Sequence, residues 1–306
     1  MPPASHRASA LVPARLPLNL LAMFDLSSVA GTFQLCQWLL ALLGLGLVAA
    51  WYFAPQLQPL RRSPPLLPAW DAPLADTLLV TWVAVCAFGV GSLLAGSLFR
   101  QFSLTTGNGW TSVLSAFGFQ GALTIAVALF SLYRRLAGRP LPPAGRRPPA
   151  PLTDRLLLGA AVFSVALPFV AGTSYLSSTA MEALGIPIHL QDLAGFFNNG
   201  SSPALLLALT FVTVVLAPLG EEILFRAGLF RFARCLLPRW AALLLSSLAF
   251  ASLHLNLVHF LPLTVLGLIL ALAYERSGSL LVPVVAHALF NLTSILNLLA
   301  GVGGSP

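Results

Sequence analysis

The sequence predicts an all-α protein, a polytopic transmembrane helix bundle of about eight spans. Of its 306 residues, 58% are hydrophobic and only 8% are charged, a balance that argues against a water-soluble globular domain. A helix needs roughly 20 apolar residues to cross the bilayer core, and such runs recur along the chain. The expected spans cover residues 34–54, 76–99, 112–133, 156–173, 203–225, 240–256, 258–274 and 280–300.

A segment rich in Pro and Arg, "RRLAGRPLPPAGRRPPAPLTDR", separates the third span from the fourth. Because this composition cannot pack as a helix, we expect a solvated linker. It divides an N-terminal transmembrane region with its linker, residues 1–150, from a second unit, residues 151–306. The chain before the first span has no compact apolar region followed by a cleavage site. We therefore expect it to lie along the membrane interface rather than to act as a signal peptide.

The basic residues predict the orientation in the membrane. The net charge of +7 could suggest nucleic-acid binding, but the arginines cluster between apolar segments, as cytoplasmic loops do, so we expect no nucleic-acid partner. Placing the Arg-free loop 174–202 outside puts thirteen of the sixteen arginines in the cytoplasm. The Ala-, Leu-, Pro- and Arg-rich composition indicates a bacterial protein of the inner membrane. Three cysteines without metal-ligand spacing predict neither a disulfide framework nor a zinc cluster.

The stretch "GEEILFR" places two of the four glutamates of the chain in the fifth apolar run. An ionisable group facing lipid costs at least ~2.5 kcal/mol, so these side chains should face the bundle interior or a water-filled cavity. Glu222 and Arg226, at i and i+4, are expected to form a structural ion pair. Glu221 points about 100° away and stays unexplained by that pair. Pro218 and Gly220 should weaken the helix beside it.

Two histidines in later apolar runs are candidates to meet Glu221. His254 follows Phe250 by four residues and shares its helix face. If the fifth and sixth spans form a hairpin that turns near residues 236–240, Glu221 and His254 lie at the same depth and can touch. His287 and Asn291, at i and i+4 on the last span, occupy one face.

Each of these polar residues alone could be an interhelical hydrogen-bonding group. Their convergence at one depth, in the cytoplasmic half of the membrane, predicts a functional site instead. A carboxylate beside an imidazole in an apolar pocket can act as a general base toward water. His287 and Asn291 carry donors that can stabilise an oxyanion. The set therefore suggests hydrolysis of an amide bond by activated water.

Three segments carry a family resemblance. "EEILFR" resembles the EExxxR motif, "FASLH" the FxxxH motif and "HALFN" the HxxxN motif of the CPBP family of intramembrane proteases, which includes CAAX prenyl endopeptidases and bacterial Abi proteins. The resemblance covers roughly residues 203–300 and implies that 151–306 is the catalytic membrane domain. It implies an endopeptidase with these roles: water activation by Glu221 and His254, an oxyanion site of His287 and Asn291, and structural support from Glu222, Arg226 and Phe250.

Alternatives remain at this point. Glu221, His254 and His287 could hold Zn²⁺, but the HExxH spacing is absent and Asn is a poor zinc ligand, so we favour a cofactor-free glutamic mechanism. Intramembrane Glu and His also mark proton-coupled transporters, although the first half has no second copy of the Glu-rich segment. A non-catalytic membrane scaffold is the third alternative. The expected partners are membrane lipid and a peptide or membrane-anchored protein substrate.

Overall fold

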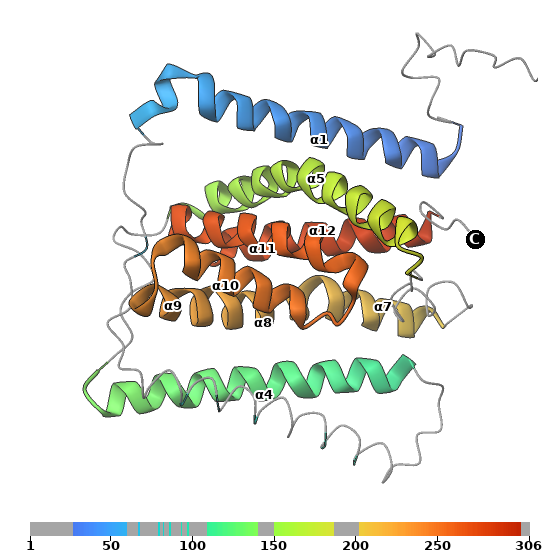
Figure 1. Ribbon diagram of the computed structural model, residues 1–306. Coiled ribbons are helices and arrows are strands. Elements are labelled where there is room, and N and C mark those ends of the chain that lie inside the picture. The colour runs from blue at the N-terminus through green and yellow to red at the C-terminus, as the bar shows by residue number, and fades with distance from the viewer. Residues whose placement is uncertain are drawn as a thin grey trace, which may run out of the picture.

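The structure is a computed structural model that describes residues 27–59, 67, 109–139, 150–186 and 202–300, with isolated positions between 79 and 97. Within these residues every regular element is a helix (Figure 1). Six helices in the described part of the chain are long and apolar enough to cross a membrane. The predicted all-α transmembrane bundle is therefore confirmed, and the protein is an integral membrane protein.

The helices match most of the expected spans, with shifted ends. The span expected at 76–99 and most of the linker lie outside the described residues, and the division at residue 150 stays a prediction. The helices used below are α1 (Val29–Phe53), α4 (Gly109–Leu136), α5 (Leu152–Ala183), α7 (Pro203–Phe211), α8 (Ala217–Glu222), α9 (Arg231–Leu236), α10 (Arg239–Ser252), α11 (Leu257–Ser277) and α12 (Leu281–Leu299).

One expected span is shorter than the sequence suggested. The run 240–256 was expected to cross the membrane, but α10 has only 14 residues, about 21 Å of helix against a hydrocarbon core of about 30 Å. The chain turns after Ser252, and Leu255 has a φ of 47°, a left-handed conformation that no helix continues through. Hydropathy did not show this end because leucines alternate with His254 and Asn256 through the turn and keep its average apolar.

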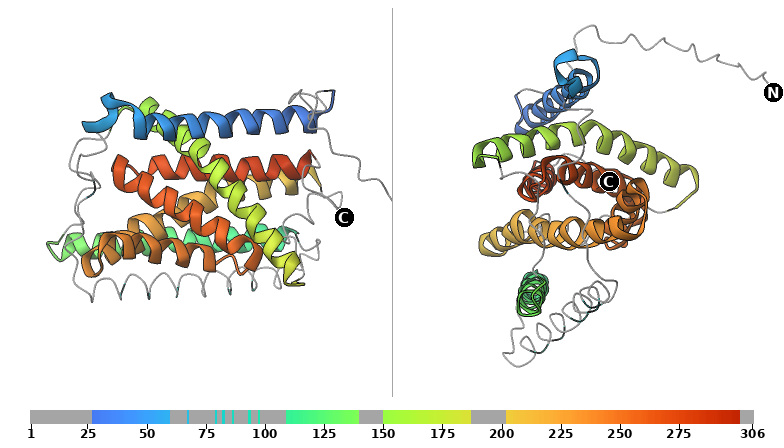
Figure 2. Two further views of the ribbon diagram at one scale, coloured as in Figure 1. Left: turned by 45° about the horizontal axis from the view of Figure 1, so that its top comes forward. Right: turned by 90° about the vertical axis from the view of Figure 1, so that its left-hand side faces the viewer.

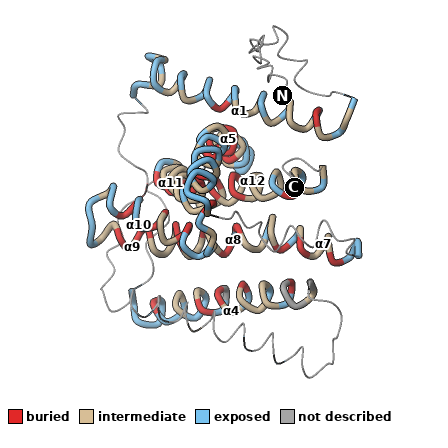
Figure 3. The backbone as a smooth tube through the Cα atoms, turned by 45° about the vertical axis from the view of Figure 1, so that its right-hand side comes forward, coloured by how far each residue is buried: buried red, intermediate tan, exposed pale blue. Residues whose placement is uncertain are grey.

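The helices form successive layers (Figure 2). α11 and α12 lie in the middle, α5 crosses over them on one side, and α1 packs on the far side of α5. The broken helix from α7 to α9, with α10, covers the other side, and α4 lies outermost against it. Buried residues gather on the inner layers, whereas much of α1 and the outer side of α4 is exposed, as expected for lipid-facing helices (Figure 3).

The chain from α7 to α9 is one long helix with two π-helical segments. The segments Val212–Leu216 and Ile223–Phe230 flank the six residues of α8 on both sides. In the first segment the Ala217 N–H donates to the Val212 carbonyl, five residues back. Pro218 comes next in this register and has no N–H to give to the Thr213 carbonyl. The predicted weakening near Pro218 thus takes the form of a π segment, a type frequently found at functional sites.

α1 is held to α5 by a close backbone approach at Gly44. A Cβ at this position would overlap the Ser164 carbonyl of α5, whereas a Cβ on Gly46, two residues on, would meet nothing within 4 Å. At the far end, the Gln37 side chain donates a 2.7 Å hydrogen bond to Asn297 of α12. Small residues that let helices approach closely are a common means of association in membranes.

The Gly44 contact gives a testable pair of substitutions. We expect Gly44→Ala to lower the free energy of unfolding by about 1–3 kcal/mol, because α1 must move away from α5. Gly46→Ala, in the same helix, should be neutral or stabilising by up to about 1 kcal/mol, because Ala has the higher helix propensity. Unfolding in mixed micelles measures both. Equal effects of the two changes would contradict the proposed contact.

Candidate active site

A fully buried ion pair lies at the centre of the site. Glu222 and Arg226 are both 0% exposed, and the Glu222 Oε1 lies 3.0 Å from the Arg226 Nη1. The Arg226 Nη2 also donates to the Gly267 carbonyl of α11 at 3.2 Å. The guanidinium carbon lies 4.6 Å from the centre of the Phe250 ring, within cation–π range. The ion pair expected from the i, i+4 spacing is therefore present, and it links three helices.

His287 of α12 lies between the two glutamates. Its Nδ1 is 2.9 Å from the Glu222 Oε1, and its Nε2 is 3.7 Å from the Glu221 Oε2. Because a carboxylate paired with a guanidinium accepts hydrogen bonds, the Nδ1–H donates to Glu222. That bond fixes the imidazole so that Nε2 faces Glu221, where it can carry a proton or a lone pair.

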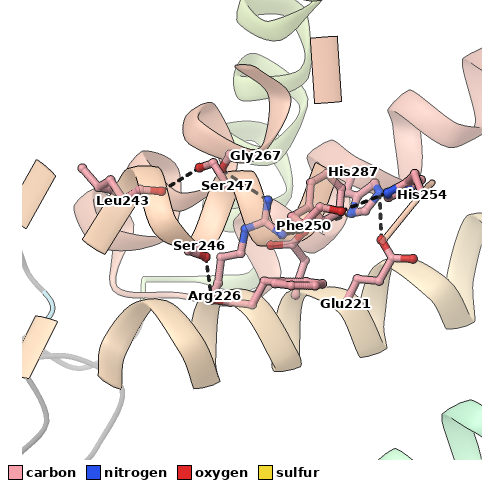
Figure 4. Close-up of polar contacts among 11 residues, drawn as sticks. Glu221, Arg226, Leu243, Ser246, Ser247, Phe250, His254, Gly267 and His287 are labelled. Carbon is pink, nitrogen blue, oxygen red and sulfur yellow. Dashed lines mark hydrogen bonds and ion pairs between the residues drawn. The ribbon is translucent and has the colours of Figure 1, made fainter. Parts of the chain in front are cut away.

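Glu221 is the more accessible of the two acids. Its side chain is 23% exposed, compared with 0% for Glu222. Figure 4 shows its carboxylate pointing toward the two imidazoles. Adjacent helical positions point about 100° apart, so one acid is directed into the core and the other to a reachable edge.

His254 lies in the turn just after α10 and is held by the backbone of that helix. Its Nδ1 lies 3.0 Å from the Phe250 carbonyl, which can only accept, so Nδ1 carries the proton and the neutral ring has its lone pair on Nε2. The Phe250 ring makes edge contacts with both imidazoles, with centroids 5.1 Å from His254 and 5.5 Å from His287. Phe250 thus separates and orients the two rings.

Asn291 donates the hydrogen bond that Pro218 cannot supply. Its Nδ2 donates a 2.8 Å hydrogen bond to the Thr213 carbonyl, the group for which Pro218 offers no N–H. The expected oxyanion role of Asn291 stays a prediction, and only the second N–H of its amide is left for it.

Within ion-pair distance Glu221 has His287 as its partner, and the expected pairing of Glu221 with His254 stays a prediction. Among the described residues no ion pair joins Glu221 to His254, although the hairpin turns where expected, between Leu236 and Arg239. Counting residues from the turn fixes depth but not the rotation of each helix. The π segment Ile223–Phe230 changes that rotation, because its turns hold more residues than α-helical turns.

Two features of the structure were not predicted from the sequence. Ser246, completely buried, donates to the Phe225 carbonyl at 2.9 Å; its position four residues before Phe250 was the available signal. At the end of the α9–α10 hairpin, Glu275 is 1% exposed and pairs with Arg234 at 3.1 Å and Arg239 at 2.6 Å. Arg234 and Arg239 thus hold the α9–α10 hairpin to α11.

The His, Cys, Asp and Glu side chains of the described residues do not form a metal site as they are placed. In the described parts of the chain no group of three His, Cys, Asp or Glu residues could hold a metal ion. Glu221, His254 and His287, the ligands considered for zinc, therefore do not form a zinc site in this arrangement.

The fold and the site together define an integral membrane protein with an acid–imidazole centre inside its helix bundle. Residues 203–293 match the family described as type II CAAX prenyl endopeptidase Rce1-like, which confirms the resemblance to the CPBP proteases over that segment. The match supports an intramembrane protease type of function. The chain is also similar to an uncharacterized 24.3 kDa protein of Escherichia coli, with 29% identity over 214 residues. The match covers 67% of this chain and 89% of that protein. No solved structure matches it.

The buried pair predicts a large loss of stability when one partner is removed. We expect Arg226→Met to lower the free energy of unfolding by about 3–5 kcal/mol, because it leaves the Glu222 charge uncompensated. Arg135→Met, at an exposed position in the last turn of α4, should cost less than about 1 kcal/mol. Unfolding in mixed micelles measures both. A comparable loss from both changes would show that Arg226 is not specially placed.

Proposed function

We propose that this protein is an intramembrane endopeptidase that hydrolyses a peptide bond near the cytoplasmic side of the membrane with water activated by Glu221. The observation that carries the proposal is the partly exposed Glu221 carboxylate 3.7 Å from His287. The neighbouring Glu222–Arg226 ion pair is fully buried, and Glu222 also contacts His287. Ionisable side chains inside a membrane protein are costly to insert, and they therefore suggest a functional site.

The residues suggest how the reaction proceeds. Glu221 takes a proton from water while the oxygen attacks the scissile carbonyl carbon, and the Nε2 of His254 orients that water. The oxyanion accepts a hydrogen bond from the protonated Nε2 of His287, whose Nδ1–H stays bonded to Glu222. When the carbon–nitrogen bond breaks, Glu221 returns the proton to the leaving amine. One peptide and one water give one acid and one amine.

The substrate we propose is the cytoplasmic tail of a membrane-anchored protein, or a peptide at the lipid surface. The family description names CAAX prenyl endopeptidases, so a prenylated CAAX peptide is the first probe to use. The bundle would lie in a bacterial inner membrane, with lipid around α1 and α4, where exposed leucines are frequent.

A zinc-dependent mechanism is the second candidate because of one observation. Both histidines bind through Nδ1 to an oxygen of the protein, which is also how metal-binding histidines are commonly oriented. Glu221, His254 and His287 are the candidate ligands, but as they are placed they do not form a group that could hold a metal ion, so zinc binding would require these side chains to move together.

Removal of the proposed base should abolish cleavage. We expect Glu221→Gln to lower kcat on a fluorogenic farnesylated CAAX peptide by about 10²–10⁴-fold without unfolding the protein, because general base catalysis contributes about that much. Glu182→Gln, exposed near the end of α5, is the matched control and should cleave at the wild-type rate. Wild-type rates from both variants would remove Glu221 from the mechanism, whereas no cleavage by the wild-type protein itself would favour a transporter or scaffold.

Chelation separates the two mechanisms. We expect purified protein to keep its full cleavage rate after exhaustive treatment with a chelator, because the glutamic mechanism needs only water and side chains. The rate on the same peptide before and after treatment is the measurement. A complete loss that added Zn²⁺ restores would replace the glutamic mechanism with the metal-dependent one.

A further inference from the structure

The helix that carries both glutamates is hydrogen-bonded on either side of them by side chains of α12 and α10. Upstream of Glu221, Asn291 of α12 donates to the Thr213 carbonyl in the first π segment. Downstream, Ser246 of α10 donates to the Phe225 carbonyl in the second π segment at 2.9 Å (Figure 4). Neither bond is part of the EExxxR pattern, and both reach a backbone carbonyl.

We infer that Ser246 is a positioning residue for the proposed reaction, which sets the orientation of Glu221 and Glu222 through the Phe225 carbonyl. The inference rests on the proposed function and names a residue that the three motifs leave out. Ser246 is 0% exposed. Its hydroxyl bonds to the carbonyl of a residue four positions after Glu221 and three after Glu222.

The position of Ser246 on α10 links this bond to both imidazoles. Ser246 and Phe250, four residues apart, share a face of α10, and His254 follows in the turn just after the helix, with its Nδ1 3.0 Å from the Phe250 carbonyl. The Phe250 ring packs edge-on against the Phe225 ring, with centroids 5.5 Å apart, and against His287 at 5.5 Å. A shift of Phe225 relative to Ser246 would therefore change the spacing between the acids and the rings.

Adjacent Ser247 provides an internal comparison. It is buried to the same degree, at 1% exposed, but its hydroxyl donates to the Leu243 carbonyl of its own helix at 2.8 Å. The two serines differ in what they hold: one bond joins two helices at the site, and the other stays within α10. Loss of the second should not move the carboxylates.

The test compares Ser246→Ala with Ser247→Ala in the full-length protein. On the farnesylated CAAX peptide we expect S246A to lower kcat about tenfold with little change in KM, since a small misplacement of reacting groups costs up to about 10²-fold. S247A should keep the wild-type kcat. Wild-type kcat in S246A, or an equal loss in both variants, would overturn the inference. If S246A does not fold, S246C, with a weaker donor, should give an intermediate kcat, and a wild-type value would also overturn it.

A second measurement does not depend on any substrate. In protein labelled with ¹⁵N-histidine, the Nδ1 resonance of His287 reports its bond to Glu222, and we expect S246A to shift it while S247A does not. If the wild-type protein does not cleave the peptide, the proposed function fails on that substrate and this resonance still decides the role of Ser246. An unchanged His287 resonance in S246A would refute the positioning role.

Discussion

The fully buried pair of Glu222 and Arg226 is the interaction on which the site depends. Two charges removed from water are tolerated only when each has close partners, so this pair determines what must surround it. His287 approaches the carboxylate, while the Gly267 carbonyl and the Phe250 ring approach the guanidinium. Four helical segments of the bundle therefore meet at one point, in a membrane where no hydrophobic effect drives helices together.

The doubled glutamate divides two tasks that one residue could not perform. A carboxylate that neutralises Arg226 is committed to accepting hydrogen bonds and is closed to water, as Glu222 is. The neighbouring side chain, rotated by about 100° on the same helix, keeps the same depth but reaches the accessible edge. His287 contacts both, through different ring nitrogens, so Glu222 orients the imidazole that faces Glu221, the proposed base.

What the sequence could predict followed from spacing along single helices. The i, i+4 ion pair, the hairpin turn beside Pro238 and most apolar spans depend on local geometry and are present. Spacing along single helices did not predict that His287 lies within ion-pair distance of Glu221, because that distance depends on rotation between helices and two π segments alter that rotation. The early end of α10 was not predicted either, because Leu253 and Leu255 keep the turn apolar on average although His254 and Asn256 lie between and after them.

The irregular helix explains why distant residues of the chain are coupled at the site. Pro218 deprives the Thr213 carbonyl of a donor, and an unsatisfied carbonyl inside a membrane is costly. Asn291 supplies the bond from α12, the helix that also carries His287. Ser246 bonds to the next π segment from α10, which leads to His254. Each imidazole-bearing helix is thus bonded to the helix of the glutamates, so acid and imidazole keep their spacing through hydrogen bonds as well as through packing.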